Sequence, residues 1–301
     1  MPIVIPQDLP AFNTLTKENI FVMNDSRALS QDIRPLDIAI VNLMPTKIET
    51  ETQLLRVLGN SPLQVNITLI KTESYVSKNA SESHLERFYT TFSEIKNRKF
   101  DGMIVTGAPV ETFEFSEVDY WEELCGIMDY AKECVTSTVF ICWGAQAAMQ
   151  RYYGIGKEVL TKKMFGVFKN RQTVENEPLL RGLDDYFNVP HSRHTKVDED
   201  AIRKNKNLTV LAEGNTCGIS IAKSNDNKAF FFFGHSEYDR ETLKKEYLRD
   251  VDKNLDIDRP HRYFSDDGTE NVDFSWRSTG SLLFNNWLNY YVYQVTPYSL
   301  V

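Results

Sequence analysis

Short apolar runs alternate with longer amphipathic stretches along the first half of the chain. The runs are rich in β-branched and aromatic residues and have the length of buried strands. Between the last two runs, 119–134 carries apolar side chains at helical spacing. Strands separated by helical crossovers predict an α/β fold, with a mostly parallel sheet and helices on both faces. The four predicted strands are Leu36–Leu43, Val65–Ile70, Phe100–Thr106 and Ser137–Ile141.

Helix signals follow the first and second predicted strands. Thr46 and Glu49 have the spacing of a capping box, a leucine stripe covers 54–58, and Gly59 comes next. We therefore predict a helix that begins near Thr46 and ends before Gly59. The polar stretch through Tyr89 to Ile95 is also predicted to contain helix.

The second half of the chain is richer in strands. Turn-forming residues separate the runs 208–212, 218–222 and 229–234, so antiparallel pairing is expected there. Helices are predicted at 239–252 and 281–292. No internal repeat or linker divides the chain, which favours one α/β domain over residues 35–301. Residues 1–34 contain three prolines and no clear periodicity, so we expect an irregular N-terminal arm packed on that domain.

Composition narrows the class of protein. The 301 residues are 42% hydrophobic and 25% charged, as in ordinary globular proteins, and no apolar run has bilayer-spanning length. A net charge of −8 disfavours nucleic-acid binding. The four cysteines form no CxxC pair and have no histidine at metal-ligand spacing, so neither a disulfide framework nor a metal site is expected. We expect a cytoplasmic protein that either acts on small molecules or binds a protein partner, and that has no nucleic-acid or membrane partner.

Cys142 stands where a nucleophile would be useful in such a fold. It follows a predicted strand and precedes 144–149, a good helix-forming run. A sharp strand-to-helix turn would expose its sulfur and direct backbone amides at it. The opposing interpretation is a buried core thiol, and the local sequence leaves the two about equal.

His235 and Glu237 offer the partners that a nucleophile needs. They follow the most hydrophobic predicted strand, so they also lie at a strand end. His235 could remove a proton from Cys142 or from an incoming hydroxyl, and Glu237 could orient the imidazole. The other four histidines are expected to be structural or on the surface.

Three motifs, each following a predicted strand, carry a family resemblance. They are Cys-Trp-Gly-Ala-Gln at 142–146, Gly-His-Ser-Glu-Tyr-Asp at 234–239, and Thr-Gly-Ala-Pro-Val-Glu at 106–111. With them the chain resembles the homoserine O-acyltransferases of methionine biosynthesis, also called homoserine O-succinyltransferases or transsuccinylases. The likeness runs from Val41 to Gln294. It implies a flavodoxin-like fold of the class I glutamine amidotransferase type.

The resemblance also implies a reaction. Acyl-CoA would acylate Cys142, and the γ-hydroxyl of L-homoserine, deprotonated by His235, would then attack the thioester in a ping-pong mechanism. Glu237 would orient His235. Lys47 and Trp143 match the oxyanion and acyl site. The resemblance implies no permanently bound cofactor, with acetyl-CoA or another acyl-CoA as co-substrate. It also implies that the protein forms a homodimer, as members of the family do.

Three further positions match substrate-binding residues of that family. They are Lys163, Ser192 and Arg249. Arg249 suits the α-carboxylate of homoserine, because a guanidinium binds a carboxylate through two parallel hydrogen bonds.

Glu111 bears on the choice of acyl group. In this family a glycine at its position resembles the succinyl-specific enzymes and a glutamate the acetyl-specific ones. A glutamate would fill the space for a succinyl tail and repel its terminal carboxylate. Acetyl-CoA is therefore the preferred donor, and succinyl-CoA is the alternative.

Two remoter hypotheses remain at this level. A glutaminase or amidotransferase could use the same triad, although Phe140 occupies the first glycine position of the G-x-C-x-G turn typical of those enzymes. An inert sheet domain that binds a partner through its acidic surface is the other. Hydrolysis of glutamine would favour the glutaminase. A Cys142 that does not react with iodoacetamide would favour the inert binding domain.

Overall fold

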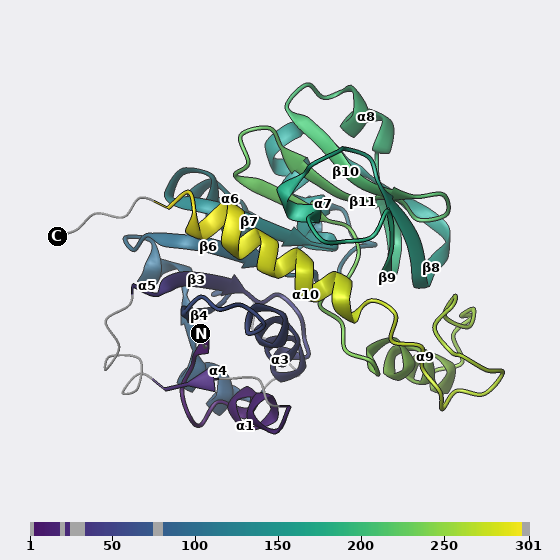
Figure 1. The fold of residues 1–301 in the computed structure, drawn as a ribbon, viewed down its shortest axis with the longest axis horizontal. Coiled ribbons are helices and arrows are strands. Elements are labelled where there is room, and N and C mark those ends of the chain that lie inside the picture. Colours follow the sequence, from purple (N-terminus) through teal and green to yellow (C-terminus); the bar gives the residue numbers. More distant parts are fainter. Residues whose placement is uncertain (1–2, 19–21, 25–33, 75–80, 297–301) are drawn as a thin grey trace.

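The computed structural model describes residues 3–18, 22–24, 34–74 and 81–296 (Figure 1). Within them, one sheet of 12 strands runs through the molecule. The strands are β1 (Ile3–Val4), β2 (Val22–Met23), β3 (Leu36–Val41), β4 (Val65–Lys71), β5 (Tyr89–Thr91), β6 (Phe100–Val105), β7 (Val135–Ile141), β8 (Lys157–Gln172), β9 (Tyr186–Val197), β10 (Leu208–Gly214), β11 (Gly218–Ser224) and β12 (Ala229–Phe232).

Helices lie between most of the strands in the first half and gather again at the end of the chain. The α-helices are α1 (Pro10–Lys17), α3 (Lys47–Leu58), α4 (Glu82–Phe88), α5 (Phe92–Ile95), α6 (Trp121–Cys134), α7 (Trp143–Tyr153), α8 (Glu199–Lys204), α9 (Thr242–Asp252) and α10 (Arg277–Asn286). Two short 3₁₀ turns are η1 (Phe115–Glu117) and η2 (Pro178–Leu180), and the π-helix η3 (Trp287–Tyr293) continues α10. None of the helices in the described residues is long and apolar enough to cross a membrane.

The sheet has a parallel part and an antiparallel part. Its order is β2-β1-β4-β3-β6-β7-β12-β11-β10-β8-β9, with β5 beside β4. Pairings from β2 to β12 are parallel, and those from β12 to β9 are antiparallel. The predicted mostly parallel α/β fold with a strand-rich second half is confirmed.

Two apolar layers cover the parallel strands. Ile38 and Ile40 of β3 pack in a cluster with α3, α10 and η3, whereas Ala39 and Val41 pack in a second cluster with α6 and α7. This alternation places successive side chains of one strand on opposite faces of the sheet. Figure 1 shows α10 lying along the sheet beside α3. Because the neighbouring strands β3, β6, β7 and β12 are parallel, their carboxyl ends lie at the same edge of the sheet, between the two apolar layers.

Part of the N-terminal arm is regular rather than irregular. Residues 3–4 and 22–23 add two short parallel strands at the sheet edge, and α1 buries Ala11 and Leu15. Pro10 starts this helix at a position where its missing N–H costs nothing, although the prolines of this segment had suggested an irregular backbone. The N-terminal arm was expected to end at residue 34, where the α/β domain begins. Residues 25–33, just before this boundary, lie outside the described residues.

One other local expectation was wrong, and one long element was not predicted. Thr46 is the N-cap of α3 but makes no side-chain capping bond, and Glu49 instead forms an ion pair with Lys245 at 2.7 Å. The long hairpin β8–β9 was missed altogether. In β9 the buried positions include His191 and Arg193, so the strand lacks the apolar alternation that normally reveals one.

Candidate active site

Cys142 lies on a strained turn between β7 and α7. Its φ of 50° and ψ of −114° are unusual for a residue with a side chain. The turn is fixed on both sides: its N–H donates to the Phe232 carbonyl at 2.7 Å, and its carbonyl accepts from Gln146 N at 3.1 Å. Gly144 permits the close packing, because a Cβ there would lie 2.6 Å from the Thr106 oxygen. The predicted strand-to-helix turn is therefore present, with Cys142 at the N-terminus of α7, but the residue is only 6% exposed.

His235 and Glu237 lie in the segment that follows β12. The imidazole Nδ1 donates to Glu237 Oε1 at 2.7 Å, which leaves Nε2 for Cys142. The His235 ring stacks on Tyr238 with centroids 4.1 Å apart. Its backbone N–H donates to the Pro190 carbonyl of β9 at 2.8 Å. His235 is thus held by its own segment, by an aromatic ring and by the neighbouring hairpin.

The neighbours of His235 raise its pKa. Burial by itself lowers the pKa of His235, but the charge of Cys142, then that of Glu237, and hydrogen bonds to both raise this pKa well above its ordinary value. Burial raises the pKa of the Cys125 and Cys217 thiols, which makes both of them poorer nucleophiles.

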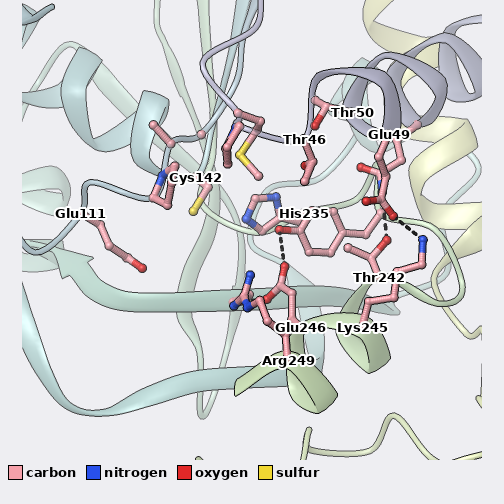
Figure 2. Close-up of a pocket in the computed structure, with 18 of the residues that line it drawn as sticks. Thr46, Glu49, Thr50, Glu111, Cys142, His235, Thr242, Lys245, Glu246 and Arg249 are labelled. Atoms are coloured by element: carbon pink, nitrogen blue, oxygen red, sulfur yellow. Dashed lines mark hydrogen bonds and ion pairs between the residues drawn. The ribbon is translucent and has the colours of Figure 1, made fainter. Parts of the chain in front are cut away.

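A cavity of about 500 Å³ opens in front of this pair. Figure 2 shows Glu111 and Cys142 at one end of it, His235 in the middle, and Glu49 with Lys245 at the other end. The loops after β3 and β6, the hairpin β8–β9 and helix α9 form its walls. The lining residues are Met44, Pro45, Thr46, Glu49, Thr50, Gln53, Gly107, Ala108, Pro109, Glu111, Thr112, Cys142, Lys163, Ser192, His194, His235, Tyr238, Thr242, Lys245, Glu246 and Arg249.

The three predicted substrate-binding residues come together in this cavity. A bulge in β8 places residues 160–163 opposite the single residue His194 of β9, and Lys163 belongs to it. Lys163 Nζ lies 3.2 Å from Asp250 and 3.6 Å from Glu246, both on α9.

Glu246 connects Ser192 to Tyr238, the residue that stacks on His235. Ser192 Oγ donates to Glu246 at 2.5 Å, and Tyr238 Oη donates to its other oxygen at 3.1 Å. Burial, and then the charge of Glu246, raise the pKa of Tyr238, so its phenol stays protonated as a donor. Arg249 is half exposed and bonded to Asp250 at 2.7 Å, and it lines the same wall. Opposite charges and hydroxyls suited to an amino acid thus lie beside His235.

Glu111 lies on the Cys142 side of the cavity. Its Oε2 accepts from the backbone N–H of Thr195 at 3.3 Å and is 3.1 Å from Thr195 Oγ1. Its carbonyl accepts from Lys157 Nζ, which also binds the Phe113 carbonyl at 2.5 Å. Both the backbone and the carboxylate of Glu111 are therefore tied to the hairpin.

The structure does not bring Lys47 and Trp143 into the cavity through their side chains. Lys47 Nζ donates to the Asn42 carbonyl and lies in a buried cluster with Glu51 and Tyr89. Burial lowers the pKa of Lys47 to about 8, against a smaller opposing effect of Glu51. Trp143 is fully buried, 6.1 Å from Phe115 between ring centroids, so what it can offer the site is its backbone N–H at the start of α7.

Sequence reasoning missed several residues of this site. Tyr238, Glu246 and Thr195 were not singled out. His194 is exposed, as expected, and it also lines the cavity. Glu246 lies three residues before Arg249, on the same face of α9, a spacing that would have pointed to it. No local feature marks Thr195, because its contacts are with residues far along the chain.

Solved structures identify the fold class. A glutamine amidotransferase from Thermotoga maritima superposes with a TM-score of 0.57, covering 85% of this chain and 98% of its own, at 13% sequence identity. A glutamine amido transferase from Methylobacillus flagellatus gives the same TM-score at 10% identity, over 85% and 95% of the two chains. The chain therefore has the class I glutamine amidotransferase-like fold, as the sequence had predicted.

Sequence comparison identifies the family. The profile of the homoserine O-succinyltransferase family matches residues 2–298, and the chain belongs to this family of acyltransferases. Among its relatives is the homoserine O-acetyltransferase of Clostridium novyi, 58% identical over 99% of both chains. The homoserine O-acetyltransferases of Clostridium acetobutylicum and Bacillus cereus are 57% and 55% identical, each over 100% of both chains.

Proposed function

We propose that the protein is a homoserine O-acetyltransferase, which transfers the acetyl group of acetyl-CoA to the γ-hydroxyl of L-homoserine in methionine biosynthesis. The observation that carries the proposal is that one cavity is lined by Cys142, His235 and Glu111. A nucleophile with its base and a carboxylate suited to select the acyl group thus face the same space. The full-length relatives named homoserine O-acetyltransferase support the same assignment.

The first half-reaction acylates Cys142. The thiolate attacks the carbonyl carbon of the acetyl thioester, and the bond from that carbon to the sulfur of CoA breaks. Imidazolium His235 gives its proton to the departing CoA thiolate. The charge of Cys142 is foremost among the influences that raise the pKa of His235. Acylation removes this charge, so the imidazolium becomes a stronger acid just when a proton must be released.

The second half-reaction regenerates the thiolate. Neutral His235 takes the proton of the γ-hydroxyl, the oxygen attacks the acetyl-enzyme, and the bond between the carbonyl carbon and Cys142 Sγ breaks. Glu237 holds Nδ1 at 2.7 Å and stabilises the imidazolium that forms. Amides at the start of α7, including that of Trp143, suit the oxyanion in both steps. Lys163, Ser192 and Arg249 would hold the amino acid beside His235.

The donor assignment depends on Glu111. The matching profile is described as homoserine O-succinyltransferase, so a succinyl donor is the alternative. A succinyl group would bring its terminal carboxylate toward Glu111, and two like charges in a partly desolvated cavity repel each other strongly. An acetyl group has no such charge and needs less space.

A competition experiment tests this function. The enzyme is incubated with acetyl-CoA, succinyl-CoA and L-homoserine together, and the products are identified by mass. O-acetylhomoserine as the main product is expected, and O-succinylhomoserine would overturn the donor assignment. Ammonia release from glutamine in the absence of any acyl-CoA would instead indicate an amidotransferase.

A further inference from the structure

The carboxylate of Glu111 is held by one residue of the hairpin. Thr195 of β9 directs both its backbone N–H and its hydroxyl toward Glu111 Oε2, at 3.3 and 3.1 Å. Among the residues that the structure describes, no lysine or arginine forms an ion pair with this carboxylate. A carboxylate on a flexible side chain keeps one position in a cavity only where donors compensate its lost hydration. Thr195 supplies those donors.

Contacts with helix α7 fix the position of Thr195. It is fully buried, and its hydroxyl lies 2.9 Å from Gln146 Oε1, on the helix that Cys142 begins. Gln146 Nε2 returns a bond to the Thr195 carbonyl at 3.4 Å. Because the threonine hydroxyl has a single proton, it serves either Gln146 or Glu111 at any moment, while the backbone N–H remains directed at Glu111. This arrangement links the position of Glu111 to the helix that carries the nucleophile.

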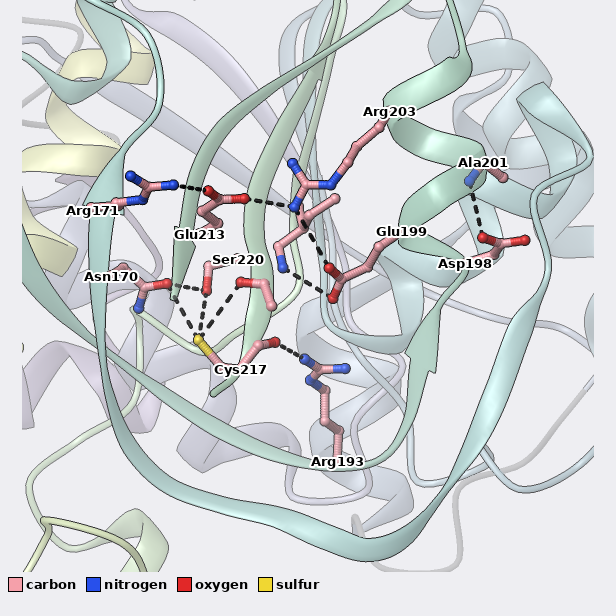
Figure 3. A network of polar contacts seen from close by, with 12 residues as sticks. Asn170, Arg171, Arg193, Asp198, Glu199, Ala201, Arg203, Glu213, Cys217 and Ser220 are labelled. Carbon is pink, nitrogen blue, oxygen red and sulfur yellow. Dashed lines mark hydrogen bonds and ion pairs between the residues drawn. The ribbon is translucent and has the colours of Figure 1, made fainter. Parts of the chain in front are cut away.

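A buried arginine of β9, two residues before Thr195, also contacts the backbone of Thr195. Arg193 is 2% exposed, and its guanidinium donates to the carbonyl of Cys217 at 2.7 Å (Figure 3). It also donates to the carbonyl of Thr195 at 2.9 Å. Its Nε donates to His191 Nδ1 at 3.3 Å. Burial lowers the pKa of His191 well below its ordinary value, so this ring is neutral and can accept that bond. Rigid supports of this kind keep a carboxylate in place.

We propose that Thr195 is a positioning residue for acyl selection: it holds the Glu111 carboxylate in the part of the cavity that a succinyl tail would occupy. Without it Glu111 could turn toward water and leave room for the larger acyl group. Thr195 does not line the cavity and touches no reacting atom, so it acts through Glu111. This inference rests on the proposed function of Glu111.

The test uses variants that change only the side chain of Thr195. Thr195→Val keeps the shape and removes the hydroxyl, whereas Thr195→Ser keeps the hydroxyl. The measured quantity is the ratio of kcat/KM for acetyl-CoA to kcat/KM for succinyl-CoA. Loss of a hydrogen bond to a charged group predicts that Thr195→Val lowers this ratio about tenfold, mainly through faster use of succinyl-CoA. Thr195→Ser should keep the wild-type ratio and Thr195→Val the wild-type KM for homoserine.

A second pair of variants separates this inference from the role of Glu111. Glu111→Gly should lower the ratio, and adding Thr195→Val to it should change the ratio no further, because both act through one carboxylate. An unchanged ratio in Glu111→Gly would refute the donor selection itself. A lowered ratio in Glu111→Gly with no effect of Thr195→Val, or with an additive effect, would overturn the role of Thr195 alone.

A general structural effect of the substitution has a different signature. It would reduce kcat/KM for both donors equally and leave their ratio unchanged, which also counts against the inference. Should Thr195→Val not fold, Thr195→Ala carries the same prediction for the ratio. Thermal unfolding of each variant shows which case applies.

Discussion

The two parts of the sheet bury different kinds of side chain. The parallel strands bury almost only apolar residues, such as Ile104 and Val105 of β6, whereas β9 buries His191, Arg193 and Thr195 at alternate positions. Apolar packing is dense and leaves little freedom, which suits a strained turn that must hold a nucleophile. Polar contacts are directional, which suits the orientation of charged groups that recognise substrates.

This difference suggests a division of labour. The parallel part carries Cys142 and His235 at strand ends, and the antiparallel part supplies Lys163, Ser192 and the support of Glu111. Damage to the first should abolish the chemistry with any substrate. Damage to the second should change which substrates are used. Substitutions in each part of the sheet test whether chemistry and substrate choice are separated in this way.

Replacing the nucleophile tests the parallel part. Cys142→Ala should abolish the acyl adduct that forms with acetyl-CoA alone and lower turnover by about a thousandfold or more, because the thioester cannot form. Intact-protein mass spectrometry detects the adduct. Cys134→Ser, at an exposed cysteine, is the matched control and should keep it. An adduct that persists in Cys142→Ala would move the nucleophile to another cysteine.

Replacing the lysine of the β8 bulge tests the antiparallel part. Lys163→Met removes a cation that is 11% exposed and pairs with Asp250 and Glu246. The loss of a charged contact to substrate should raise KM for homoserine about 30-fold, while the adduct with acetyl-CoA still forms. The neighbouring Lys162→Met removes an exposed cation and should leave both quantities unchanged. Slower adduct formation in Lys163→Met would refute the division.

The smallest effect concerns the buried lysine of the parallel part. Burial lowers the pKa of Lys47 from 10.5 to about 8, so the unfolded chain binds more protons than the folded one above pH 8. The free energy of unfolding should therefore rise between pH 7 and pH 9 by about 1 kcal/mol more in the wild type than in Lys47→Met. Urea unfolding at both pH values measures this difference. An equal rise in both proteins would show that Lys47 is not buried as described.

Local patterns predicted the parallel part well. β3, β4, β6, β7, α6 and α9 lie within a few residues of their expected positions, because apolar runs and helical stripes there reflect burial directly. Cys142, His235 and Glu237 also follow strands, as expected from the sequence. The capping box at Thr46 failed because Glu49 finds Lys245, a partner 196 residues away.

The hairpin β8–β9 was not predicted, because in β9 the pattern of apolar residues does not reflect burial. The buried positions of β9 mix the polar residues His191, Arg193 and Thr195 with apolar ones, so polar residues stand on both faces of the strand and the usual alternation is lost. Those polar residues can be buried only because other parts of the fold supply their partners, as Cys217 in the turn between β10 and β11 does for Arg193 and Gln146 of α7 does for Thr195.

By itself, the sequence determined the α/β class, the parallel strands and the family to which the chain belongs, because periodicity and short motifs are local properties. Only the tertiary structure decided that Lys47 turns away from the cavity, that Lys163 and Glu246 face each other, and that Thr195 holds Glu111. These contacts join residues far apart in the chain. Which partner satisfies a buried polar group depends on the folded arrangement of strands, and no local pattern records it.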